Sequence, residues 1–126
     1  MTYLERWFDY NRRQKEIEAL LEETVAQQSE QRLTLKEFYL LYYLDLADEK
    51  SLRQIDLPDK LHLSPSAVSR MVARLEEKNC GLLSRRCCDQ DRRASFICLT
   101  DEGQTALAYL QKAVEERLEM SLDFIS

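Results

Sequence analysis

A capped amphipathic helix that runs directly into two short β-type segments is the sequence feature that most constrains this fold. Ser64 and Pro65 form a typical helix start, because a serine hydroxyl caps the first turn and a proline there sacrifices no needed N–H donor. The spacing predicts a helix to about Lys78, with apolar residues three and four apart on one face: Val68, Met71, Val72 and Leu75.

The segment after this helix predicts a β-hairpin. Leu82–Cys88 and Ala94–Leu99 are short runs of β-type residues, and they flank a charged tip that contains Asp91, Arg92 and Arg93. The sequence therefore predicts a helix followed by a small two-stranded hairpin.

Helical spacing dominates the rest of the chain, which has only two glycines and two prolines among 126 residues. A helix is predicted from Tyr3 to about Gln28. The capping box Thr34–Glu37 predicts a second, largely apolar core helix that ends near Leu46. Leu52–Leu63 is read as a short extended piece followed by a short helix, which Asp56 caps and which carries Pro58 in its first turn.

Thr100 is the predicted cap of a last helix, and acidic residues in its first turn suit the helix dipole. Its apolar stripe continues to the chain end (Leu107, Leu110, Val114, Leu118, Leu122 and Ile125). That stripe is too long for a chain of this size to cover, which favours a partner subunit. The N-terminal helix, with Leu4, Trp7 and Phe8, fits packing on its own core and packing on a partner equally well.

Charge is unevenly distributed along the chain. The net charge is −5, but the stretch from Lys60 to Cys98 has eight Lys and Arg against four acids, a local charge of +4, so the remainder carries −9. A basic block in an acidic protein is typical of a local phosphate-binding surface. The outer face of the Ser64-capped helix is small, hydroxylated and arginine-bearing, which suits insertion into a DNA groove, although a plain solvated face is the commoner fate of such a stripe.

The order of elements is that of a winged helix-turn-helix, mainly α with a small β-hairpin wing, flanked by N- and C-terminal helices. At this point the chain resembles the MarR family of bacterial transcriptional regulators. The resemblance covers roughly Leu33 to Gly103, through LTLKEFYLLYYL, LHLSPSAVSRMVARLEEKN with CGLLSRR, and DRRASFICLTDEG. It implies one MarR-like domain, with an N-terminal dimerisation helix (1–31), a winged-helix DNA-binding core (32–100) and a C-terminal dimerisation helix (101–126).

The resemblance places the predicted DNA contacts on the Ser64-capped helix and on the hairpin tip. The helix would lie in the major groove and the tip arginines in the adjacent minor groove, with Asp91 orienting an arginine. Lys60, His62 and Arg86 would contact the DNA backbone. The predicted DNA-binding residues are Ser64, Ser66, Ser69, Arg70, Arg74, Arg86, Arg92, Arg93, Lys60 and His62.

The same resemblance implies a homodimer and a cleft for a small aromatic effector. The predicted dimer residues are Leu4, Trp7, Phe8, Leu110, Val114, Leu118 and Leu122. Tyr39, Tyr42 and Tyr43 could line the effector cleft, but tyrosines on a core helix more often serve packing.

Cysteine and histidine suggest little further chemistry. Cys87 and Cys88 could form a redox site beside arginines that lower a thiol pKa, although free cysteines more often fill small gaps in a core. With a single histidine and no cysteine spacing typical of zinc, neither a metal nor any other cofactor is expected.

The leading functional hypothesis is therefore a cytoplasmic, homodimeric, sequence-specific DNA-binding regulator, a repressor, acting on a pseudo-palindromic site. The alternative is a winged-helix protein-interaction module without specific DNA binding, which acids Glu76 and Glu77 would favour if they interrupted the basic surface. An enzyme is not expected, because no nucleophile–base pair or phosphate loop is present. No segment is long and apolar enough to suggest a membrane span.

Overall fold

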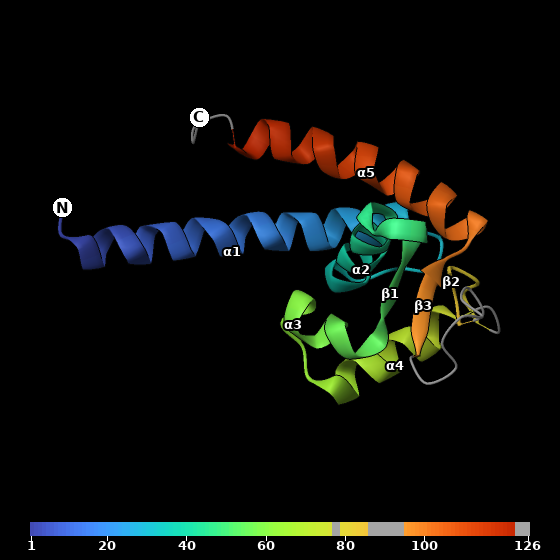
Figure 1. Cartoon of the computed structure of the whole chain (residues 1–126). Helices are drawn as coiled ribbons and strands as arrows, with labels where there is room; N and C mark the ends of the chain where they lie inside the picture. Colours follow the sequence, from blue (N-terminus) through green and yellow to red (C-terminus); the bar gives the residue numbers. More distant parts are fainter. Residues whose placement is uncertain (77–78, 86–94, 123–126) are drawn as a thin grey trace. The chain divides into compact units, whose positions relative to one another are not determined.

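The computed structural model describes residues 1–76, 79–85 and 95–122, and its elements follow the predicted order (Figure 1). The fold is mainly α-helical with a small antiparallel sheet, as predicted. The elements are α1 (Tyr3–Gln28), α2 (Leu35–Leu46), η1 (Asp48–Lys50), β1 (Ser51–Arg53), η2 (Gln54–Asp56), α3 (Leu57–Leu61), α4 (Pro65–Leu75), β2 (Leu83–Ser84), β3 (Phe96–Leu99) and α5 (Asp101–Leu122).

The chain forms two compact units. One comprises Met1–Leu35 together with Leu110–Ser126, and the other comprises Lys36–Tyr109. The second unit contains α3, α4 and all three strands, and it extends past the predicted DNA-binding core (32–100) into the first turns of α5.

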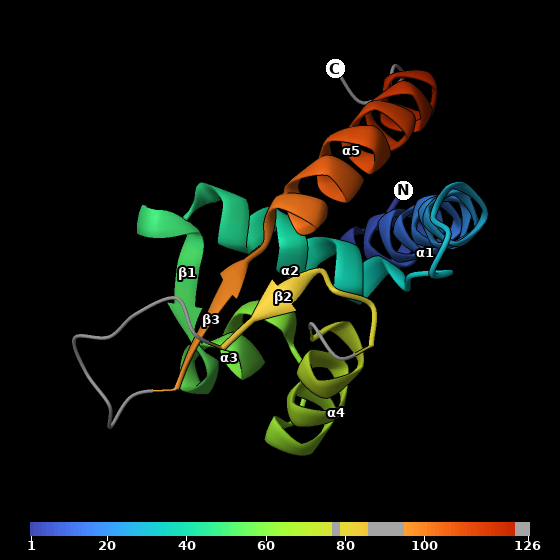
Figure 2. The same ribbon diagram turned by 90° about the vertical axis from the view of Figure 1, so that its right-hand side faces the viewer.

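The sheet has three strands, one more than the hairpin that the sequence predicted. Its order is β1-β3-β2, with both neighbours antiparallel to β3 (Figure 2). In the register, Leu83 faces Leu99 and Leu52 faces Ile97. The sequence predicted the extended piece near Leu52. It did not predict its pairing, because the partner strand lies more than 40 residues later and local residue patterns do not reveal it.

Leucines from most elements of the second unit form its core. Helix α2 contributes the largest share, which confirms it as a core helix, and α3, α4, the strands and the start of α5 supply the rest. The fully buried side chains of this unit include Leu40, Leu41, Leu44, Leu57, Leu61, Leu75, Leu82, Leu83, Ile97 and Leu107.

The first unit is unevenly buried. Helix α1 begins with a capping box in which the Glu5 N–H donates to Thr2 Oγ1 and the Thr2 N–H donates to the Glu5 carboxylate. Its buried residues, Leu21, Thr24 and Val25, all lie in its C-terminal half. The apolar side chains of the first turns are exposed in the single chain.

Helix α3 is short, as predicted, and begins after Asp56 with Pro58 in its first turn. Asp56 occupies the predicted N-cap position, but its side chain does not cap the helix. The Asp56 carboxylate makes no capping hydrogen bond, and it accepts instead from Arg53 Nε at 3.2 Å. The 3₁₀ turn η2 leads the chain into α3 in place of a side-chain cap.

Helix α4 ends at Leu75, earlier than the predicted end near Lys78, because Glu76 leaves the helical conformation (φ −62°, ψ 164°) and the chain turns back locally. The Leu82 N–H donates to the Leu75 carbonyl oxygen at 2.9 Å. The Glu76 carbonyl oxygen accepts two hydrogen bonds of 2.9 Å, one from the Asn79 N–H and one from the Gly81 N–H. Gly81 adopts φ +74°, a conformation that glycine accepts without strain, and this closes the turn into β2.

Candidate nucleic-acid interface

The start of α4 is built as the sequence predicted. The Ala67 N–H donates to Ser64 Oγ at 3.1 Å, and Pro65 occupies the first helical position. Val68, Val72 and Leu75 are buried, whereas the opposite face is exposed. That exposed face carries Ser66, Ser69 and Arg70.

Arg74, predicted to contact DNA, has a partner inside the fold. Its Nη1 donates to Glu37 Oε2 of α2 at 2.5 Å, where the Glu37 side chain is 4% exposed and that of Arg74 is 41% exposed. The pair fixes α4 to the core helix. Arg74 therefore has a structural task that its position on the helix wheel did not reveal.

Lys60 and His62 lie at the C-terminal end of α3, and both are exposed. The Lys60 ammonium stands 5.7 Å from the centre of the Tyr43 ring. His62 ends the helix in the left-handed conformation, at φ 55°. Lys36 Nζ donates to the Leu61 carbonyl oxygen at 2.6 Å, which satisfies one of the terminal carbonyl groups of α3.

The base of the predicted wing is described, but its tip is not. Strands β2 and β3 pair as an antiparallel hairpin base, which confirms that part of the prediction. The residues expected at the tip and beside it lie outside the described residues: Arg86, Cys87, Cys88, Asp91, Arg92 and Arg93.

A polar network connects α4 to the base of the wing, and sequence reasoning missed it. Gln54 Nε2 donates to Ser69 Oγ at 3.2 Å, and Arg85 Nη1 donates to Gln54 Oε1 at 2.8 Å. Arg85 also donates to Ser95 Oγ at 3.3 Å and, through Nε, to Glu76 Oε1. The sequence separations are 31 residues for Arg85 and Gln54 and 15 for Gln54 and Ser69, so only the positive charge of Arg85 was visible beforehand.

The motif Leu99-Thr100-Asp101-Glu102-Gly103 forms the joint between β3 and α5. The Gly103 N–H donates to Thr100 Oγ1 at 3.0 Å, which confirms the predicted cap, and Thr100 Oγ1 itself donates to the Gly81 carbonyl oxygen at 2.7 Å. Gly103 is buried, and a Cβ atom there would lie 2.3 Å from the Leu82 carbonyl oxygen. Glycine is thus required because the backbone of the β2 segment passes directly against the first turn of α5.

The tyrosines predicted for an effector cleft lie on α2 with mixed exposure. Tyr39 and Tyr43 are half-buried, and Tyr42 is exposed. Lys36 lies 6.0 Å from the centre of the Tyr39 ring, so two of the three rings have a lysine over them.

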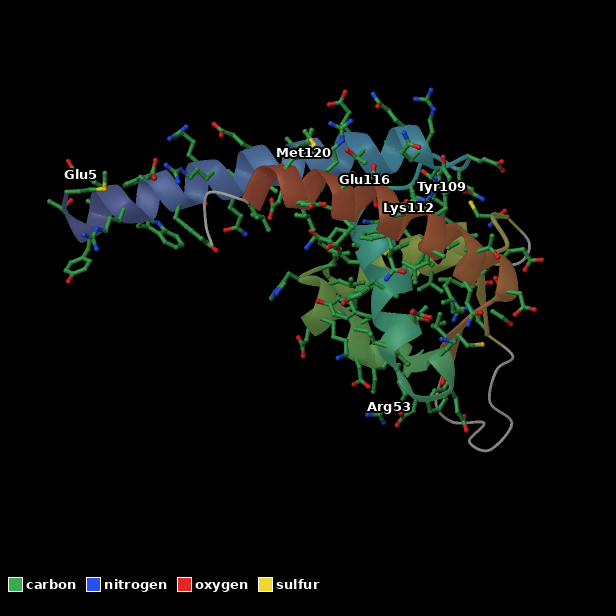
Figure 3. All side chains as sticks on the ribbon, turned by 90° about the horizontal axis from the view of Figure 1, so that it is seen from above. Glu5, Arg53, Tyr109, Lys112, Glu116 and Met120 are labelled. Atoms are coloured by element: carbon green, nitrogen blue, oxygen red, sulfur yellow. The ribbon has the colours of Figure 1, made fainter. Side chains whose placement is uncertain are left out.

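The predicted dimer residues divide into two groups. Leu4, Trp7, Phe8 and Leu122 are exposed in the single chain, and Leu118 is half-buried. Leu110 and Val114, however, are only 1% and 6% exposed. These two side chains therefore belong to the chain's own core and present little surface to a partner. Also on α5, Tyr109 and Met120 are among the exposed side chains (Figure 3).

Three further observations concern the described residues alone. They contain no group of three or more His, Cys, Asp or Glu side chains placed to hold a metal ion. None of the described helices is both long and apolar enough to cross a membrane. Of the cysteines in these ranges, Cys80 is half-buried, and Cys98 is buried with its thiol donating to the Ser84 carbonyl oxygen at 3.5 Å.

Comparison with known proteins places this arrangement in a family. The chain is 36% identical over 98 residues to the uncharacterized HTH-type transcriptional regulator YdgJ of Bacillus subtilis, a match that covers 78% of this chain and 54% of YdgJ. It is 33% identical over 81 residues to the HTH-type transcriptional repressor MdtR of the same organism, covering 64% of this chain and 50% of MdtR. The chain thus spans about half the length of the curated relatives it matches.

Solved structures of MarR family regulators have the same fold as this chain. The DNA complex of Sco3205, a MarR family transcriptional regulator from Streptomyces coelicolor, has a TM-score of 0.81 and 25% identity, covering 97% of this chain and 75% of that one. AbsC, another MarR family regulator from S. coelicolor, has the same fold, with a TM-score of 0.83 at 21% identity and coverage of 100% and 83%. The sequence profile of the MarR family matches residues 33–95, half of the chain. The chain therefore belongs to the MarR family of transcriptional regulators.

Proposed function

We propose that the chain binds double-stranded DNA in a sequence-specific manner and regulates transcription. The observation that carries this proposal is the outer face of α4, where Ser66, Ser69 and Arg70 are exposed together on a helix whose other face is buried. Short hydroxylated side chains let a helix approach the bases closely, and arginine is the commonest reader of guanine in the major groove. The DNA complex of Sco3205 adds support from a relative of the same fold.

The remaining predicted contacts divide between the backbone and the minor groove. Lys60 and His62, exposed at the end of α3, would contact phosphates and fix the position of α4 without reading bases. Arg86, Arg92 and Arg93, with Asp91 orienting an arginine, remain predictions for the wing. Ser64 would contribute through its place at the N-terminus of α4, although its hydroxyl already caps the helix.

The alternative is a module that binds only protein partners, which unpaired acids within the basic surface would favour. Glu76 lies at the end of α4, and its carboxylate accepts from Arg85, so its negative charge is offset by that arginine. Glu77 lies outside the described residues.

We further propose that the chain acts as a homodimer on a pseudo-palindromic site. The exposed apolar side chains at the start of α1, with Leu118 and Leu122 of α5, are the proposed contact surface. A two-fold dimer would present its two α4 helices to half-sites about 34 Å apart, one turn of DNA. Repression is the proposed direction of regulation, in line with the relative MdtR, which is named a repressor.

Modulation by a small aromatic effector is the last element of the proposal. Tyr39, Tyr42 and Tyr43 would line its site, and the lysines over two of these rings would favour a ring that carries an acidic group. Release of bound DNA by benzoate, with cyclohexane carboxylate as the non-aromatic control, is the expected result. Equal release by both acids would contradict an aromatic site.

Selection of DNA sites from a random pool tests the central proposal. We expect a two-fold symmetric motif, with binding that weakens steeply as salt rises because phosphate contacts release counterions. Arg70→Ala should lower affinity for the selected site by about tenfold or more. Failure to enrich any motif, or an Arg70→Ala variant that binds the selected site like the wild type, would overturn the proposal.

A further inference from the structure

The side chain of Ser69 is held by a relay that begins at the base of the wing. Ser69 stands on the exposed face of α4, and its Oγ accepts a hydrogen bond from Gln54 Nε2 at 3.2 Å. Gln54 lies in η2, just before α3, and its own N–H donates to the Ser95 carbonyl oxygen at 2.8 Å, so its backbone is tied to the start of β3.

Arg85 determines which way the Gln54 amide points. A guanidinium group carries only donors and keeps its charge, so the group facing it must be an acceptor. Arg85 Nη1 lies 2.8 Å from Gln54 Oε1, which places the amide oxygen toward Arg85 and the amino group toward Ser69. Arg85 is itself held by Glu76 and Ser95, so its position does not depend on Gln54 alone.

This orientation fixes the role of the Ser69 hydroxyl. A serine hydroxyl has one hydrogen to donate and two lone pairs that accept. Gln54 is its sole hydrogen-bond partner among the described residues, and it occupies a lone pair, so the hydroxyl hydrogen remains available on the exposed face of the helix.

We propose that Gln54, oriented by Arg85, is a specificity-determining positioning residue that makes Ser69 a hydrogen-bond donor toward DNA. The proposal rests on the proposed DNA-binding function and deepens it. In the major groove guanine, adenine and thymine offer acceptors at N7, O6 or O4, whereas cytosine offers only the N4 donor. At the base facing Ser69 the wild type should therefore disfavour cytosine.

Reversing the polarity of the amide provides the sharpest test. In Gln54→Glu the carboxylate can still accept from Arg85, but it can only accept from Ser69, so it takes the hydroxyl hydrogen and leaves lone pairs facing the DNA. The preferred base should then change to one with an amino donor, cytosine or adenine. In the control Gln54→Met, which has similar length and neither a strong donor nor a strong acceptor, the preference should relax without reversing.

The measurement is competition binding with duplexes that differ at one position of the selected site. Ser69→Ala first identifies the position at which discrimination is lost. There, Gln54→Glu should change the relative affinity for cytosine over thymine by about three- to tenfold in favour of cytosine, the size of one hydrogen bond. The added negative charge weakens all duplexes alike and cancels in the ratio. Thermal unfolding monitors the fold of each variant.

The outcomes separate this proposal from the one it rests on. If both Gln54 variants keep the wild-type preference at the position that Ser69→Ala relaxes, the relay does not set specificity, while DNA binding stands. The relay is excluded in the same way if Ser69→Ala relaxes no position of a well-defined motif. If the wild type selects no motif, both proposals fall. A reversed preference confined to that position would establish the relay.

Discussion

Arg74 of α4 donates to Glu37 of α2 at 2.5 Å, and the carboxylate that it meets is almost completely buried. This ion pair joins the helix that would read DNA to the core helix of its unit. A buried carboxylate without a partner is costly, whereas the arginine is partly solvated and recovers some hydration when freed. The pair is thus asymmetric, and the two partners should respond differently to substitution.

We expect Arg74→Ala to lower the free energy of unfolding by about 1–3 kcal/mol, because it leaves the Glu37 charge buried without its arginine. Urea denaturation measures the loss. Arg70→Ala, on the exposed face of the same helix, is the matched control and should stay within about 0.5 kcal/mol of the wild type. Equal stability of the two variants would show that the ion pair contributes nothing.

Gly103→Ala should destabilise the protein by about 1–3 kcal/mol, despite the higher helix propensity of alanine. The added methyl group would meet the Leu82 carbonyl oxygen at 2.3 Å and Leu99 Cδ1 at 2.6 Å. Gly81→Ala is the comparison, since a Cβ there meets nothing within 4 Å and only the positive φ opposes it. Thermal melts in which Gly103→Ala matched or exceeded the wild type would contradict the tight joint.

Glu49→Gly should stabilise the protein by about 0.5–1 kcal/mol. Glu49 adopts φ 55°, a left-handed conformation that strains residues with a Cβ atom and suits glycine. Its neighbour Lys50 shares the conformation but bonds to Asp45 Oδ1 at 2.7 Å, so Glu49 is the cleaner position to change. Glu49→Ala retains the strain and should be neutral. Chemical denaturation measures the free energy of unfolding of both variants. Equal stability of Glu49→Gly and Glu49→Ala would show that the backbone at Glu49 is not strained.

Trp7→Glu should weaken the proposed dimer by about tenfold or more while leaving the single chain folded. Trp7 is 59% exposed, so a charge there costs the monomer little but would be buried against a partner. Sedimentation equilibrium measures the dimer and circular dichroism the fold. Val114→Ala should instead destabilise the single chain, lowering its free energy of unfolding by about 2 kcal/mol through a core cavity. A Trp7→Glu dimer as tight as the wild type would place the interface elsewhere.

Local chemistry accounts for what the sequence predicted well. The caps at Ser64 and Thr100 and the apolar stripe of α4 depend on residues within one or two turns, so they could be read directly. The exposed face of α4 followed from the same periodicity.

The errors occur where distant segments meet. The third strand depends on pairing between Leu52 and Ile97, which lie far apart in the sequence. The burial of Leu110 and Val114 could not be told from the stripe alone, because an apolar stripe looks the same whether its own chain or a partner covers it. The Gln54 relay likewise joins residues with no local pattern.

The outer strand β1 has a consequence for the behaviour of the protein in concentrated solution. An exposed sheet edge can recruit a strand from another molecule and seed aggregation. Here β1 extends for only three residues before the chain turns into η2. A strand of this length offers too few backbone groups to template a neighbour. The brevity of β1 thus protects the pure protein from edge-to-edge self-association.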